Sequence, residues 1–158
     1  MRTKRAKIIA VVPDAKYGST RVTKLINYVM REGKKTVAQK QVYKALELLE
    51  AKTKKDALVA FDEVLDIITP PMEVRSRRIG GAAYQIPVAV KPRRGMSLAL
   101  RWLVQEANKR PNKQFHTFAE KLEAEMLDAL NNQGGSIDRK NTSLRMAEAN
   151  KAFAHFRW

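Results

Sequence analysis

The chain has 158 residues, and its 44% hydrophobic content is that of a globular protein rather than a disordered one. Its charge is unusual, because 31 Lys and Arg residues against 16 Asp and Glu residues leave a formal net charge of +15, which attracts polyanions such as nucleic acid. No cysteine is present and no apolar run approaches the roughly 18 residues of a membrane-spanning helix, so disulfides, thiolate metal sites and membrane spans are excluded, and one soluble intracellular domain is predicted.

The first 19 residues are predicted to form an extended basic arm. Arg2, Lys4, Arg5 and Lys7 open it, and the turn-forming stretch PDAKYGS at 13–19 closes it. Two interpretations stay open for the free protein: a frayed tail, or a strand-like segment that orders on a phosphate backbone. In a complex we favour the second.

Three amphipathic helices are predicted next, because apolar residues recur at helical spacing from Ser19 to the Thr69-Pro70-Pro71 stop. We expect Gly33 to end the first helix, and Thr36 and Asp56 to cap the N-termini of the second and third.

The third of these helices is acidic. It carries Asp62, Glu63 and Asp66, with no Lys or Arg after Asp56. Such a face should point away from a polyanion or toward a basic partner.

The stretch from Met72 to Met96 has the alternating pattern of strands, and residues 72–91 are predicted to form a two-stranded ribbon. Two alternating runs flank Gly80-Gly81, which indicates a tight hairpin turn. A two-residue loop places Arg77 opposite Tyr84; a four-residue loop keeps the same faces, and a three-residue loop would scramble them.

Cations dominate this ribbon and its exit, with Glu73 as the single acid; they are Arg75, Arg77, Arg78, Lys91, Arg93 and Arg94. A hairpin standing alone in water is marginally stable. We therefore expect the ribbon to lie on an anionic ligand, nucleic acid above all. On an isolated ribbon Tyr84 has no core to enter, so a stacking or partner-contact role is as plausible as a structural one.

Three more helices are predicted: from about Ser97 to Arg110, along the apolar stripe between Phe115 and Ala129, and from about Ile137 to Ala154. The face beside the middle stripe carries Glu120, Glu123, Glu125 and Asp128. Of these, Glu120, Glu123 and Asp128 are interpreted as a solvent- or partner-facing surface. Trp102 is assigned to the core rather than to base stacking. The C-terminal aromatics (Phe153, Phe156, Trp158) form either a latch onto the body or a protein contact.

The predicted fold is therefore mainly α: a single domain, residues 1–158, of about six helices with a protruding two-stranded β-ribbon and an extended basic N-terminal arm.

Catalytic and metal-binding chemistry is not expected. His116 and His155 are the only histidines, and their separation fits no metal-ligand spacing. The run Gly33-Lys34-Lys35-Thr36 fails the phosphate-loop motif, which needs glycine where Tyr28 stands and Ser or Thr in place of Lys35. Lys34 and Lys35 are then either complements of a helix dipole or phosphate contacts. No enzyme activity, cofactor or metal is predicted.

Five blocks of sequence add a resemblance to these observations. They are PDAKYGS (13–19), LINYVMREGKK (25–35), EVRSRRIGGAAYQIPVAVKP (73–92), LALRWLVQEANKR (98–110) and RMAEANKAFAHFRW (145–158). In their order and separation they resemble the bacterial-type small-subunit ribosomal protein seven family, most weakly over 111–140.

The resemblance implies a structural protein that binds the 3′ major (head) domain of small-subunit rRNA and nucleates head assembly. It places the ribbon near the exit-site tRNA and the mRNA path. Neighbouring small-subunit proteins, notably protein eleven, are the implied partners, with no membrane contact and no homo-oligomer. The implied location is the ribosome, in a bacterial cytoplasm or a plastid.

The predicted rRNA-binding residues are Arg2, Lys4, Arg5, Lys7, Lys34, Lys35, Arg75, Arg77, Arg78, Lys91, Arg93, Arg94, Arg101, Lys109, Arg110, Arg145 and Lys151. The ribbon residues predicted near tRNA and mRNA are Arg77, Arg78, Gly80, Gly81, Ala82 and Tyr84. The predicted protein contacts are Phe153, His155, Phe156 and Trp158.

The alternative is an architectural protein of double-stranded DNA, whose β-arms enter a minor groove. Such arms present a wedge side chain at the tip, and Gly80-Gly81 offers none. An RNA-modifying enzyme is a third class, disfavoured by the missing catalytic site.

Overall fold

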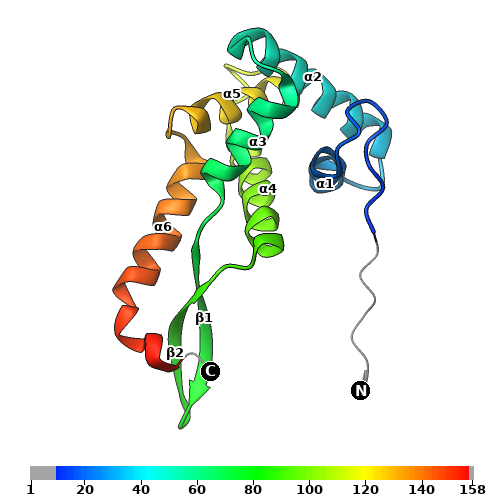
Figure 1. The fold of residues 1–158 in the computed structure, drawn as a ribbon. Coiled ribbons are helices and arrows are strands. Elements are labelled where there is room, and N and C mark those ends of the chain that lie inside the picture. The colour runs from blue at the N-terminus through cyan, green and yellow to red at the C-terminus, as the bar shows by residue number, and fades with distance from the viewer. Residues whose placement is uncertain (1–9, 157–158) are drawn as a thin grey trace.

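The structure, a computed structural model, describes residues 10–156. Within them six α-helices, one short 3₁₀ helix and one antiparallel hairpin make up the fold (Figure 1). The elements are α1 (Thr20–Val29), α2 (Lys35–Thr53), α3 (Ala57–Ile68), β1 (Met72–Ile79), β2 (Ala82–Ala89), α4 (Pro92–Lys109), α5 (Phe118–Leu130), α6 (Gly135–Ala149) and the 3₁₀ helix η1 (Lys151–Phe156). The prediction of a mainly helical fold with a β-ribbon is confirmed.

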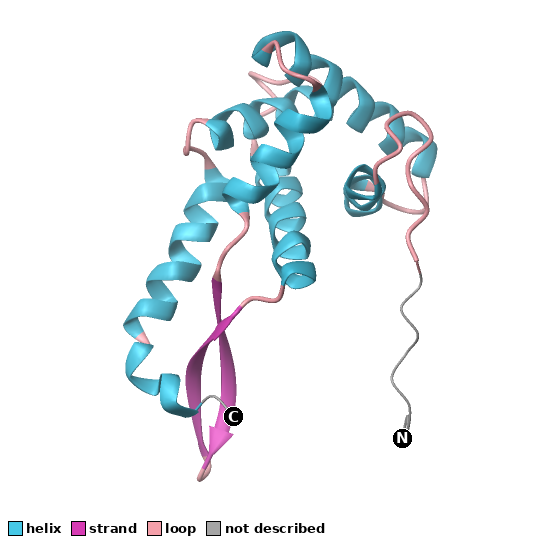
Figure 2. Ribbon diagram, viewed as in Figure 1, coloured by secondary structure: helices cyan, strands magenta, loops and turns pink. Residues whose placement is uncertain are grey.

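Helices α1–α5 form what we call the body, and β1–β2 form the ribbon that projects from it (Figure 2). Helix α5 packs against α2, α3, α4 and α6, so it occupies the middle of the body. One hydrophobic core runs through these helices, with Phe61, Leu46 and Leu122 fully buried. Trp102 is partly buried against this core, as predicted.

The helix ends test the capping predictions. Asp56 caps α3, because its Oδ1 accepts the backbone N–H groups of Leu58 and Val59 at 2.8 and 3.3 Å. The prediction for Gly33 was wrong: α1 already ends at Val29, and Gly33 with φ 71° serves the turn to α2.

The predictions for the starts of two other helices also need correction. Helix α2 begins at Lys35 with Lys34 at the N-cap position, so Thr36 lies inside the helix rather than capping it. Helix α4 begins at Pro92, earlier than the sequence pattern indicated. Proline fits the first turn of a helix, because N–H groups there make no hydrogen bond within the helix and the missing N–H of proline costs none.

The ribbon has the register expected of a two-residue loop: Arg77 lies opposite Tyr84 and Arg75 opposite Ile86. Gly80 (φ 58°) and Gly81 (φ 89°) both occupy the left-handed region that such a turn requires. One more hydrogen bond, from the Val90 N–H to the Pro71 carbonyl at 2.9 Å, extends the pairing toward the body.

The ribbon does not stand alone, contrary to the expectation from sequence. Helix α6 runs beside β1, and η1 packs against β2 (Figure 1). The Tyr84 ring lies 5.4 Å from the Phe153 ring and 5.6 Å from the Phe156 ring, measured between centroids. Phe153 and Phe156 therefore form an intramolecular latch, but it holds the ribbon and not the body, as one of the two interpretations had it. Trp158 lies outside the described residues.

The last helix also ends earlier than predicted. It stops at Ala149, and the chain tightens into η1 up to Phe156. None of the helices within residues 10–156 combines the length and the apolar character needed to cross a bilayer.

Candidate nucleic-acid interface

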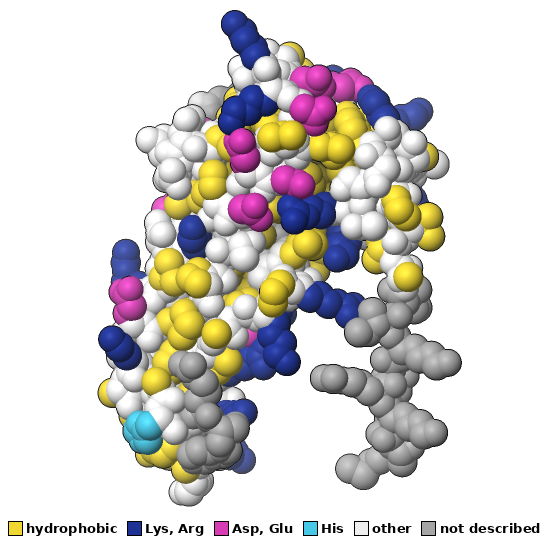
Figure 3. All heavy atoms as spheres, in the orientation of Figure 1, with side chains coloured by type: hydrophobic (Ala, Val, Ile, Leu, Met, Phe, Trp, Pro, Cys, Tyr) yellow, Lys and Arg dark blue, Asp and Glu magenta, His cyan; other side chains and the backbone are white. Residues whose placement is uncertain are grey.

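Exposed cations gather on the ribbon and on the end of α4 that faces it. Arg75, Arg77 and Arg78 are exposed on β1, and Lys91 and Arg93 are exposed where the chain enters α4. In the face shown in Figure 3, Lys and Arg side chains surround the lower end of α4 and the ribbon, whereas the Asp and Glu side chains lie mainly over the upper, helical part, which also carries cations. The predicted ribbon cations thus share one end of the molecule.

A cluster at the root of the ribbon joins two of these arginines. The buried Glu73 carboxylate accepts Arg75 Nε and Nη2 on one oxygen, at 2.8 and 2.5 Å, and Arg94 Nε on the other at 3.1 Å. Because Arg94 belongs to α4, this root cluster ties β1 to the body. Burial raises the pKa of the Glu73 carboxyl, but the hydrogen bonds from Arg75 and Arg94 outweigh it and hold the pKa below its ordinary value.

The cationic surface continues along α4. Arg94 and Arg101 are two helical turns apart and therefore share a face of the helix, and both are exposed. On the other side of the ribbon, Arg145 of α6 and Lys151 of η1 are exposed. No acidic partner within residues 10–156 is assigned to Arg101, Arg145 or Lys151.

Lys34 and Lys35 lie apart from this group, where the α1–α2 turn enters α2. Both are exposed, and Lys34 Nζ lies 2.6 Å from Glu32 Oε2. Arg31, also exposed, belongs to the same turn. Arg31 was not among the predicted rRNA-binding residues, although it belongs to the same basic run, REGKK.

Two of the predicted rRNA-binding cations form ion pairs with carboxylates of the same chain. Arg110 donates from Nε and Nη2 to Glu125 Oε2, at 2.9 and 2.6 Å, and Nη2 also reaches Asp128. Its neighbour Lys109 pairs with Glu106 at 2.7 Å. Only the Lys109 side chain remains well exposed.

Glu123 does not belong to the solvent- or partner-facing surface that we predicted on α5, whereas Glu120 and Asp128 are partly exposed. Glu123 and Glu125 are buried, the first beside Lys52 Nζ at 2.9 Å. The second accepts the N–H and the hydroxyl of Ser136, at 2.8 and 2.7 Å, besides Arg110. The physical reason is that α5 is surrounded by four other helices, so its sides as well as its apolar stripe are covered.

The predicted N-terminal arm is described only from residue 10. Its basic residues Arg2, Lys4, Arg5 and Lys7 lie outside the described residues. The visible part turns at Asp14, whose side chain accepts the Tyr43 hydroxyl at 2.8 Å and the Lys16 N–H at 3.1 Å, so it packs on α2.

Within residues 10–156 no group of three or more His, Asp or Glu side chains could hold a metal ion. Within the described residues, exposed cations lie on a thin ribbon, at one helix end and on one interhelical turn.

Comparison with known proteins agrees with this arrangement. A family model described as ribosomal protein S7p/S5e matches residues 1–151. The chain belongs to the S7p/S5e family. The resemblance noted in the sequence is thereby confirmed.

Several S7p/S5e relatives carry the name small ribosomal subunit protein uS7. The one from Dictyoglomus thermophilum is 53% identical over 148 residues, which cover 94% of this chain and 93% of the relative. Those from Thermosipho africanus and a Sulfurovum species are 52% and 48% identical over the full length of both chains. The S7p/S5e match includes the ribbon and every predicted rRNA-binding position up to Lys151.

Proposed function

We propose that this S7p/S5e member is a structural protein of the small ribosomal subunit that binds rRNA of the 3′ major (head) domain and nucleates assembly of the head. The observation that carries the proposal is the gathering of exposed arginines and lysines on the ribbon, the start of α4 and η1. Full-length similarity to proteins named for the small subunit supports it.

Binding follows from the charges. Each Lys or Arg that neutralises a phosphate releases condensed counterions, and such contacts fix position rather than read sequence. The acidic residues of α3, Asp62, Glu63 and Asp66, lie on the body and not on the ribbon. Because these carboxylates repel the RNA phosphates, the ribbon rather than α3 faces the RNA.

The ribbon is proposed to reach toward the exit-site tRNA and the mRNA path. Its tip is bare backbone: a Cβ placed on Gly80 or Gly81 would meet no atom within 4 Å. Arg77, Arg78 and Ala82 flank this tip and are exposed. Tyr84 is packed against Phe153 and Phe156, so its part in the proposal is to hold the ribbon rather than to stack on a base.

A protein neighbour, in particular protein eleven, is proposed to contact the C-terminal end. His155 is exposed there beside Phe156, with ring centroids 3.9 Å apart. Within the ribosome the chain is proposed to act as a single copy, in the bacterial cytoplasm.

A charge-matched pair of variants tests the proposal. Replacing Arg75, Arg77 and Arg78 with Gln should weaken binding to head-domain RNA and flatten the log–log salt slope by about 2 units, at ~0.7–0.9 per lost phosphate contact. The control replaces Lys44, Lys54 and Lys55, which are exposed on the second half of α2 and the turn after it, and removes the same net charge. Equal slopes for both variants would contradict the role of the ribbon, and preference for duplex DNA at equal salt would contradict rRNA as the ligand.

A further inference from the structure

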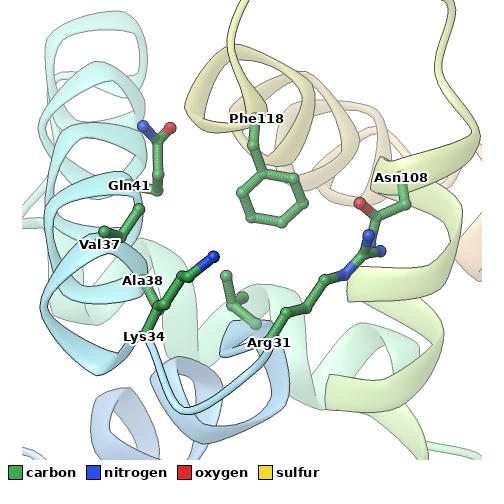
Figure 4. A pocket seen from close by; sticks show the side chains of 8 residues that line it. Arg31, Lys34, Val37, Ala38, Gln41, Asn108 and Phe118 are labelled. Carbon is green, nitrogen blue, oxygen red and sulfur yellow. The ribbon is translucent and has the colours of Figure 1, made fainter.

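A pocket lies on the body, away from the ribbon. It is formed by the end of α1, the α1–α2 turn, the first turns of α2, the end of α4 and the start of α5, and measures about 240 Å³. Its lining is Val29, Arg31, Lys34, Val37, Ala38, Gln41, Asn108 and Phe118. Figure 4 shows the Phe118 ring pointing into it between Gln41 and Asn108.

The floor of the pocket is apolar and open to solvent. Phe118 is half-buried, and Val37 at the rim is 55% exposed, one of the few large apolar side chains on the described surface with so much area in water. A pocket of this volume is below the ~300–1,000 Å³ of drug-sized ligand sites. It suits a single planar ring system against the Phe118 ring.

Two amides flank this floor with complementary polarity. Gln41 Oε1 accepts the Ala119 N–H at 3.1 Å, which orients the amide and leaves its NH₂ group as a donor. Asn108 Nδ2 donates to the Val104 carbonyl at 2.8 Å, which leaves Oδ1 as an acceptor. A donor and an acceptor on opposite sides of a flat apolar seat match the polar edges of a nucleobase.

Cations stand at the mouth. Arg31 and Lys34 line the pocket, and Lys35 follows directly; all three are exposed. Glu32 is the acid beside them, paired with Lys34 on the surface. A phosphate attached to a base in the pocket would meet a positive field at this mouth.

We propose that this pocket binds the base of one unpaired rRNA nucleotide, with its phosphate on Arg31 and Lys34. The inference rests on the proposed function and adds to it a contact that reads a base as well as one that neutralises charge. An apolar protein side chain would fill the floor but would not use the remaining donor of Gln41, the remaining acceptor of Asn108 or the positive charge at the mouth. The charge at the mouth therefore favours RNA as the occupant.

The proposal is tested by a substitution at the rim that places a large side chain in the pocket. Val37→Trp should weaken binding to head-domain RNA about tenfold, the effect expected when one stacked base is displaced. The matched control is Val59→Trp, because Val59 is 53% exposed on α3 and has the same chemistry. Arg31→Gln should weaken binding without filling the pocket, and both Trp variants should keep the wild-type unfolding midpoint.

Chemical probing of the bound RNA gives the second measurement. With Val37→Trp one or two unpaired nucleotides should gain reactivity while the rest of the footprint stays protected. Wild-type affinity for Val37→Trp, or equal weakening by Val59→Trp, would overturn the pocket proposal and leave the proposed function intact. Wild-type protein that does not bind the RNA would overturn the proposed function itself.

A photo-crosslinking residue at position 37 in assembled subunits separates the possible occupants. A crosslink to rRNA supports the proposal. A crosslink to a ribosomal protein with none to rRNA overturns it.

Discussion

The body and the ribbon use the same pair of residue types, arginine and glutamate, in opposite ways. In the body, the side chain of Arg110 is 17% exposed and that of its partner Glu125 only 2%. At the root of the ribbon, Glu73 is buried, but the side chains of Arg75 and Arg94 remain 58% and 44% exposed. The guanidinium groups of the root cluster can therefore hold a carboxylate and still meet a phosphate, whereas that of Arg110 is largely enclosed with its carboxylate partners.

Breaking the buried pair tests this contrast most strongly. Arg110→Ala should lower the free energy of unfolding by about 3 kcal/mol, because it leaves a buried carboxylate without its cation. Denaturant unfolding measures this, with Arg101→Ala as the exposed control, expected within about 0.5 kcal/mol of wild type. Below the unfolding transition the Arg110 variant should keep the wild-type salt slope for RNA; a slope lower by about one unit would mean that Arg110 contacts phosphate.

Removing the latch tests whether the ribbon depends on the C-terminal segment. Tyr84→Ala should lower stability by about 2 kcal/mol, since a half-buried ring and two ring contacts are lost. Hydrogen exchange should increase in residues 72–89 and 150–156 and not in the body. Tyr84→Phe keeps the ring and should exchange like wild type; unchanged protection in the Ala variant would show that the latch does not hold the ribbon.

Neutralising the root cluster should give the smallest effect. Glu73→Gln should cost about 1 kcal/mol near neutral pH, because solvent replaces part of what the exposed arginines lose. The pKa of Glu73 is depressed in the folded state, so its contribution is complete above the ordinary value of about 4.5 and is lost as pH falls through the lower folded value. The stability difference between wild type and variant should thus shrink from about pH 7 to about pH 3. A difference that grows in acid would contradict the assigned direction.

Local patterns explain which features were predictable. The Gly80-Gly81 turn fixes the strand register. Side chains alternate between the two faces of a strand, so the length of the turn decides which side chains of β1 and β2 share a face. The Asp56 cap acts within three residues, so the sequence shows it directly. The periodic apolar stripes likewise located the helices, with errors confined to their ends.

Long-range contacts account for what the sequence did not reveal. Arg110 meets a carboxylate fifteen positions away, and Tyr84 meets rings near the C-terminus. Neither pairing leaves a periodic trace, because both depend on how helices pack. The pocket lined by Phe118 also joins four helices, and its amides, Gln41 and Asn108, belong to different ones.

Helix α6 gives the molecule a mechanical property that its secondary structure alone does not convey. The chain enters the ribbon at Pro71 and leaves it at Pro92. Two strands connected to the body only at these points could rotate together as a hinge about the line that joins them. Helix α6 adds a third connection away from that line. Lys140 Nζ donates to the Ile67 carbonyl at 2.6 Å, and Ser143 Oγ donates to the Met72 carbonyl at 3.2 Å. Farther along the ribbon, η1 contacts Tyr84. With three connections to the body, the ribbon resists rotation about its base. A force on the Gly80-Gly81 tip is therefore transmitted to the helices instead of moving the ribbon.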